Sequence, residues 1–118
     1  MTTTLPVSYF DALYARWDDP WRFETSAYEQ AKYQATLDAL PGPRYRRALE
    51  IGCSIGVLTE RLADRCEQLV AMDPASKALE LARSRCRQIP HVPFVHGQAP
   101  DDWPAWRFYL ILFVAGFF

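Results

Sequence analysis

A turn with two glycines, Gly52 and Gly56, separates a short apolar run from a helical pattern, and it constrains the fold more than any other feature. The apolar run covers Ala48 to Ile51, and the helical pattern covers Val57 to Arg65. Such a turn is typical of parallel α/β sheets, in which ligands bind at the carboxyl ends of the strands. We expect Gly52 to adopt the conformation of a tight turn and Gly56 to allow close packing of the helix on the strand.

The alternation of apolar runs and helical patterns continues along the chain and sets the fold class. Short apolar runs predict further strands at 69–72, 92–95 and 108–114, and a helical pattern covers 76–88. Strand, helix, strand in this order predicts a parallel sheet with crossover helices. We therefore predict an α/β fold, with a Rossmann-like parallel sheet of about four strands and flanking helices.

Two helical patterns precede this sheet and divide the chain into two parts. One covers 7–16, and the other runs from about 26 to 40, where Pro41-Gly42-Pro43 ends it. We expect residues 1–43 to form an N-terminal helical lid. Residues 44–118 would then form a half-domain that packs with the lid as one structural unit.

Composition excludes several classes of protein. The chain has 118 residues with 13 basic and 14 acidic side chains, so its charge does not demand nucleic acid or an anionic membrane as a partner. Three cysteines without paired spacing predict reduced thiols in the cytoplasm. Residues 1–6 have no secretion-signal pattern, and the apolar run at 108–118 is shorter than the roughly 20 residues of a membrane-spanning helix. We predict no metal site.

Two interpretations of the glycine turn fit poorly. A dinucleotide-binding turn needs G-x-G-x-x-G, but Ser54 stands at the second glycine position and the last glycine comes one residue early. Gly52 to Gly56 also matches the hydrolase pattern G-x-S-x-G, and Asp73 and His91 or His96 follow in the order of a triad. However, that fold places several strands before its nucleophile, and here one short strand precedes the turn.

A third interpretation, binding of S-adenosylmethionine (SAM), also explains two acids. Glu50 lies two residues before Gly52, where a carboxylate can hold the ammonium group of an amino acid. Asp73 ends the next strand, about 20 residues after the turn, where an acid accepts hydrogen bonds from both ribose hydroxyls. The glycine turn and the two acids form one connected set, so we favour SAM as the cofactor.

The same residues carry a family resemblance. The stretch from Ala48 to Thr59, ALEIGCSIGVLT, resembles motif I of class I SAM-dependent methyltransferases. Over about residues 8 to 112 the chain is similar to the nodulation methyltransferases, the NodS-like family, with further matching blocks at Asp19–Glu29, Val70–Ala75 and Phe94–Pro104. The resemblance implies N-methylation of an amino sugar, on an oligosaccharide precursor of nodulation-factor type, or of a similar small amine.

The resemblance also implies a set of cofactor-binding residues: Glu50, Gly52, Cys53, Ser54, Gly56, Asp73, Pro74, Gln98, Ala99, Trp21, Tyr28 and Lys32. In this set the glycine turn surrounds the methionine part of the cofactor, Asp73 holds the ribose, and Gln98 and Ala99 lie near the adenine. The N-terminal helices roof the pocket, and simple packing of Trp21 and Tyr28 on the sheet is the alternative role for these aromatics. The sequence assigns no catalytic residue.

The end of the chain departs from the family pattern. Relatives usually have Phe-Asp-Leu-Ile and then a polar turn, whereas this chain has Phe108-Tyr109-Leu110-Ile111 and then an apolar stretch. A full class I domain also continues through three more strands. We therefore expect an incomplete half-domain that lacks the catalytic turn. The alternatives are a non-enzymatic remnant that binds SAM weakly, and a fragment that self-associates through an exposed fourth-strand edge.

Overall fold

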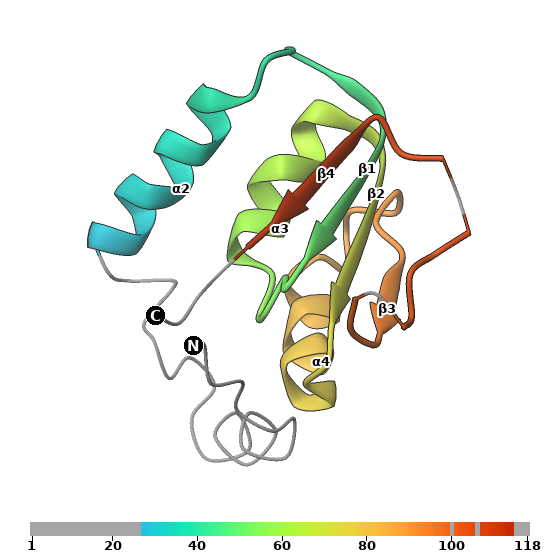
Figure 1. Ribbon diagram of the computed structural model, residues 1–118. Helices are drawn as coiled ribbons and strands as arrows, with labels where there is room; N and C mark the ends of the chain where they lie inside the picture. The colour runs from blue at the N-terminus through green and yellow to red at the C-terminus, as the bar shows by residue number, and fades with distance from the viewer. Residues whose placement is uncertain (1–26, 100, 106, 115–118) are drawn as a thin grey trace, which may run out of the picture.

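The structure is a computed structural model that describes residues 27–99, 101–105 and 107–114 (Figure 1). Within these residues the elements follow one another as α2 (Ala27–Ala39), β1 (Tyr45–Ile51), α3 (Val57–Leu62), the 3-10 turn η1 (Ala63–Arg65), β2 (Cys66–Asp73), α4 (Ser76–Arg85), β3 (Phe94–His96) and β4 (Leu110–Phe113). The helix predicted at 7–16 and the candidate site residue Trp21 lie outside the described residues. Each strand and helix predicted from residue 26 onward is present.

The four strands form one parallel sheet in the order β3-β2-β1-β4. This order confirms the predicted Rossmann-like fold. Glu50 lies beside Ala71 of β2 on one side and Leu112 of β4 on the other. The end of β1 is therefore covered on both edges, and its carboxyl end faces the turn that carries the site.

Strand β1 is longer than the apolar run that predicted it. Its pairing with β2 begins at Tyr45, although Arg46 and Arg47 are exposed. A parallel ladder joins backbone groups, so strand pairing can continue where the side chains are charged and solvated. An apolar run therefore marks only the buried half of this strand.

Helix α2 packs against the sheet unit beside α3 (Figure 1). Its Tyr33 and Leu37 are buried in the same apolar cluster as Leu58 and Leu62 of α3. The guanidinium of Arg65 donates to the carbonyl of Leu37 at 2.5 Å, and also to the carbonyls of Gly42 and Pro43 in the loop after α2. Because helix ends leave carbonyls unpaired, this arginine fixes the carboxyl end of α2 on the sheet unit.

Strand β4 is one of the two edge strands of the described sheet and has two different faces. Leu110, Leu112 and Val114 pack against the core, whereas Ile111 and Phe113 are exposed. The ring of Trp103 lies 6.5 Å from that of Phe113 on the exposed side. In the described part of the chain, no helix is long and apolar enough to cross a membrane.

Candidate functional site

The glycine turn after β1 is held in a left-handed conformation. Gly52 has φ +87°, Ser54 +53° and Gly56 +86°. The amides of Gly52 and Cys53 both donate to the carbonyl of Met72, at 2.8 and 3.0 Å, which ties the turn to the end of β2. A β-carbon on Gly52 would lie 2.5 Å from the carbonyl oxygen of Val114, so no other residue fits without a shift of the backbone.

Gly56 has a packing role that differs from the expected one. A β-carbon at this position would lie 3.1 Å from the side chain of Ala82 in α4. The expectation that Gly56 allows close packing of a helix on a strand is therefore corrected, because its close neighbour is another helix. Gly56 is buried beneath the turn and is not among the residues that line the cavities described below.

Asp73 links the end of β2 to the glycine turn. Its Oδ2 accepts the Ser54 amide at 2.8 Å, and its Oδ1 accepts the Ala75 amide at 2.9 Å. The residue is 8% exposed. A carboxylate oxygen can accept more than one hydrogen bond, so these amides orient the group without exhausting its capacity to accept hydroxyl groups.

Glu50 is a fully buried carboxyl group at the end of β1. Its Oε1 accepts a hydrogen bond of 2.6 Å from the hydroxyl of Thr59 in α3. Its Oε2 is buried and has no hydrogen-bond partner among the described residues. Burial raises the pKa of Glu50 from 4.5 to about 7, an effect that the Thr59 hydrogen bond opposes and the nearby charge of Asp73 reinforces.

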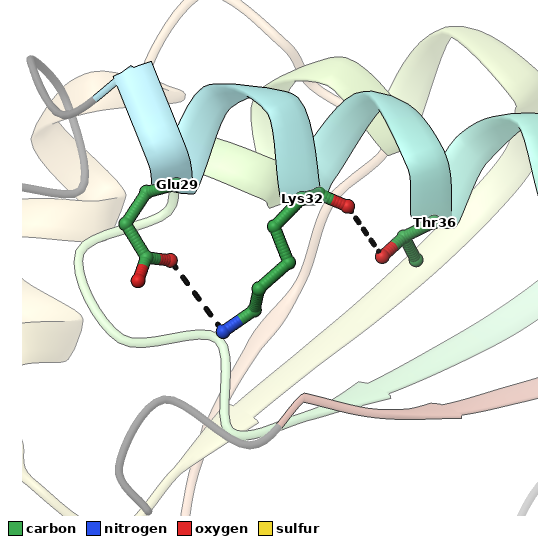
Figure 2. Close-up of polar contacts among 3 residues, drawn as sticks. All are labelled: Glu29, Lys32 and Thr36. Carbon is green, nitrogen blue, oxygen red and sulfur yellow. Dashed lines mark hydrogen bonds and ion pairs between the residues drawn. The ribbon is translucent and has the colours of Figure 1, made fainter.

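These groups meet in a cavity between α2 and the glycine turn. Its lining consists of Glu29, Lys32, Tyr33, Glu50, Gly52, Cys53, Ser54, Val57, Leu58, Asp73 and Val114. Glu29 and Lys32 form an ion pair of 3.6 Å, and their side chains point from α2 toward the loop after β1 (Figure 2). With three carboxyl groups and one ammonium group, the cavity suits a ligand that carries positive charge.

A second, more open cavity adjoins the first. It shares Gly52 and Val114 with the first cavity, and its other lining residues are Ile51, Pro74, Gly97, Gln98, Ala99 and Phe113. Asp102 closes the loop at this place, because its side chain accepts the Gln98 amide at 3.0 Å and its own amide donates to the Gln98 carbonyl at 2.9 Å. The glycine turn thus separates a charged cavity from a largely apolar one.

The two cavities bring together most of the residues that the sequence indicated. Those in the first cavity are Lys32, Glu50, Gly52, Cys53, Ser54 and Asp73, and those in the second are Gly52, Pro74, Gln98 and Ala99. Tyr28 is not brought to either cavity and is 74% exposed. It precedes Glu29 by one residue, which places it about 100° further around the helix.

Glu29 and Tyr33 line the cavity, although the sequence did not indicate them as site residues. Together with Lys32 they have the spacing i, i+3, i+4, which places all three on one helical face. That spacing could have indicated them once Lys32 was chosen. Thr59 is a further missed residue, because nothing in a helical pattern marks a threonine as the partner of a buried acid.

The hydrolase interpretation has little support in the structure. The Nε2 atom of His91 lies 2.9 Å from the Ala63 carbonyl, and that of His96 lies 2.9 Å from the Pro74 carbonyl. Within the described residues only β1 precedes the turn of Ser54, whereas the nucleophile of a hydrolase fold follows several strands. Residues 27–99, 101–105 and 107–114 also contain no cluster of three or more side chains suited to a metal ion.

Comparison with known proteins gives consistent matches. The sequence profile described as Nodulation protein S (NodS) matches residues 13–101. Nodulation protein S of Bradyrhizobium diazoefficiens is 40% identical over 79 residues, which are 66% of this chain and 38% of that protein. The chain therefore spans less than half the length of this relative.

Two solved structures are similar as well. The N-methyltransferase NodS from Bradyrhizobium japonicum WM9, in complex with S-adenosyl-L-homocysteine, superimposes with a TM-score of 0.75 at 30% identity, over 80% of this chain and 48% of that one. A methyltransferase described as putative from Pseudomonas syringae gives a TM-score of 0.66 at 45% identity, over 73% and 55% of the two chains.

Proposed function

We propose, because the chain belongs to the nodulation protein S (NodS) family, that it binds S-adenosylmethionine and takes part in methyl transfer to an amine. The observation that carries this proposal is Glu50. Its Oε2 is buried in the wall of the charged cavity without a hydrogen-bond partner in the described part of the chain. A buried carboxylate oxygen in this state needs a strong donor, and the ammonium group of the cofactor's methionine part is one.

The other residues of the two cavities fit the rest of the cofactor. Asp73 is oriented by two backbone amides and can accept the ribose hydroxyls. Lys32 can hold the carboxylate of the methionine part from the side of α2. Gln98 and Ala99 line the more apolar cavity, where we place the adenine, and Gly52 lets the ligand approach the backbone between the two cavities.

The chemistry that S-adenosylmethionine supplies is an electrophilic methyl group on a positively charged sulfur. The chain's contribution is to position this group and to balance its charge. The carboxyl groups of Glu29, Glu50 and Asp73 surround the first cavity and favour a cation there. The left-handed turn at Gly52 is fixed to the end of β2 before any ligand arrives, so this positioning is preorganised.

We further propose that the acceptor is an amine of an amino sugar on an oligosaccharide, or a similar small amine. The support is the family, together with Glu29, an acid that lines the cavity from α2 rather than from the sheet. A carboxylate on that side can attract an ammonium group of the acceptor. In this account residues 1–43 act as the lid, residues 44–118 hold the cofactor, and the protein works in the cytoplasm. No observation in the described residues favours the alternative of a non-enzymatic remnant.

The test is transfer of a labelled methyl group from S-adenosylmethionine to deacetylated chitooligosaccharides. Fully acetylated chitooligosaccharides serve as the matched acceptor without a free amine, and the Asp73→Ala chain gives the background. We expect label in the deacetylated acceptor alone, a result that would also overturn the expectation from the sequence that the chain lacks groups needed for catalysis. Label at the background level would contradict the proposed activity, and equal label in both acceptors would contradict the proposed amine.

A further inference from the structure

The hydrogen bond between Thr59 and Glu50 joins two fully buried side chains at the floor of the charged cavity. Glu50 ends β1, and Thr59 is the third residue of α3, on the other side of the glycine turn. The 2.6 Å contact is short for a hydroxyl and a carboxyl group, as is usual when the acceptor is ionised. Neither residue is exposed to solvent, so no water competes for this bond.

This bond gives the two oxygens of Glu50 different roles. Oε1 is held by Thr59, whereas Oε2 is buried without a hydrogen-bond partner among the described residues. With Oε1 fixed, the carboxyl group cannot turn freely, and Oε2 remains available to the cavity that Glu50 lines. The hydroxyl donor also favours the charged form of the carboxyl group, because it stabilises the anion that burial penalises.

We propose that Thr59 is a positioning residue that favours the ionised form of Glu50 and orients it, so that the site selects nucleosides carrying an ammonium group over nucleosides that lack one. This inference rests on the proposed function and adds a determinant of ligand specificity to it. Thr59 does not line the cavity and acts only through Glu50.

Other charged and titratable groups near Glu50 also affect its charge state. Asp73 of β2 raises the pKa of Glu50 by like charge, and Glu29 and Lys32 of α2 line the same cavity. Cys53, in the turn after β1, is buried beside the cavity, and its thiol pKa is raised mainly by burial, so it stays neutral. Among these neighbours only Lys32 is a cation, and it is paired with Glu29. Thr59 is thus the neighbour that donates a hydrogen bond to Glu50 from inside the fold.

The experiment compares two ligands on matched variants. S-adenosylhomocysteine carries the ammonium group, whereas methylthioadenosine has the same nucleoside without the amino acid. Thr59→Val keeps the side-chain shape and removes the hydroxyl, Thr59→Ser keeps the hydroxyl, and Thr36→Val is a control. The Thr36 hydroxyl donates to the Lys32 carbonyl at 2.9 Å, outside the cavity lining (Figure 2).

We expect Thr59→Val to weaken S-adenosylhomocysteine binding about tenfold or more near pH 7, and methylthioadenosine binding less than about threefold. Thr59→Ser should restore most of the affinity, and Thr36→Val should alter neither ligand. The pH at which S-adenosylhomocysteine affinity rises should also move upward by about one unit in Thr59→Val, since the anion has lost a donor. A purely structural role would leave this pH profile in place.

Failure of the role of Thr59 and failure of the proposed function would give different results in this experiment. Equal loss for both ligands in Thr59→Val, or no loss for either, would overturn the role of Thr59. Wild-type protein that binds neither ligand would instead count against the proposed function. If Thr59→Val does not fold, Thr59→Cys offers a similar volume with a weaker donor, and we expect the same selective loss at a smaller size.

Discussion

The burial of Glu50 leads to a prediction about protein stability that can be tested without a ligand. Its carboxyl group is fully buried, and burial raises its pKa from 4.5 to about 7, against the effect of the Thr59 hydrogen bond. The folded protein therefore holds this proton more tightly than the unfolded chain does. The contribution of Glu50 to stability is greatest below pH 4.5 and is lost as the pH rises through about 7.

The size of the effect follows from the interval between the two pKa values. At about 1.4 kcal/mol per pH unit, the interval from 4.5 to about 7 corresponds to about 3 kcal/mol of unfolding free energy. Glu50→Gln removes the titration and leaves a neutral group of similar shape. As the pH rises from acidic to mildly alkaline, we expect the unfolding free energy of the variant to increase by about 3 kcal/mol relative to that of wild type. At mildly alkaline pH, the net stabilisation of the variant over wild type should be smaller than this change, because the buried amide has unpaired donors of its own.

The assay is denaturant unfolding of wild type and Glu50→Gln, without ligand, across that pH range. Glu67→Gln is the matched control, because Glu67 is an exposed acid in a surface ion pair with Arg46. We expect the control to follow wild type at every pH. A difference in unfolding free energy between Glu50→Gln and wild type that stays constant with pH would contradict this prediction, since it would mean that Glu50 titrates alike in the folded and unfolded states.

Three further predictions concern the turn, the second acid and the edge strand. Asp73→Ala should weaken S-adenosylhomocysteine binding by about 1.5–3 kcal/mol in calorimetry and Asp73→Asn by less, with the exposed Asp64→Asn as control; unchanged affinity would contradict the placement of the ribose. Gly52→Ala should destabilise the protein by at least about 1 kcal/mol in denaturant unfolding, because its β-carbon would lie 2.5 Å from a backbone oxygen; wild-type stability would show that the turn is not constrained. Ile111→Lys should reduce self-association in light scattering by placing a charge on the exposed face of β4, and an unchanged particle size would exclude that face as the contact.

The sequence predicted the order of the elements and the position of the glycine turn because both depend on local patterns. The left-handed conformation of Gly52 follows from the need for a tight turn between a strand and a helix. Strand boundaries were less predictable, since β1 extends through exposed Arg46 and Arg47, where no apolar pattern marks it.

Site residues were predictable where they lie at strand ends and less so on helices. Glu50 and Asp73 follow directly from their place at the ends of β1 and β2. On α2, Tyr28 has the i, i+4 spacing with Lys32 but is exposed, and Glu29 and Tyr33 line the cavity beside Lys32 instead. The partnership of Thr59 with Glu50 depends on how α3 packs on β1, and no local pattern contains that information.

The decisive measurement is calorimetric titration of the wild-type chain with S-adenosylhomocysteine and, separately, with NAD. Both ligands carry an adenosine, but only the first carries the ammonium group that Glu50 would hold. The expected result is that S-adenosylhomocysteine binds at least about tenfold more tightly than NAD, a difference of about 1.4 kcal/mol. Equal or tighter binding of NAD would contradict it.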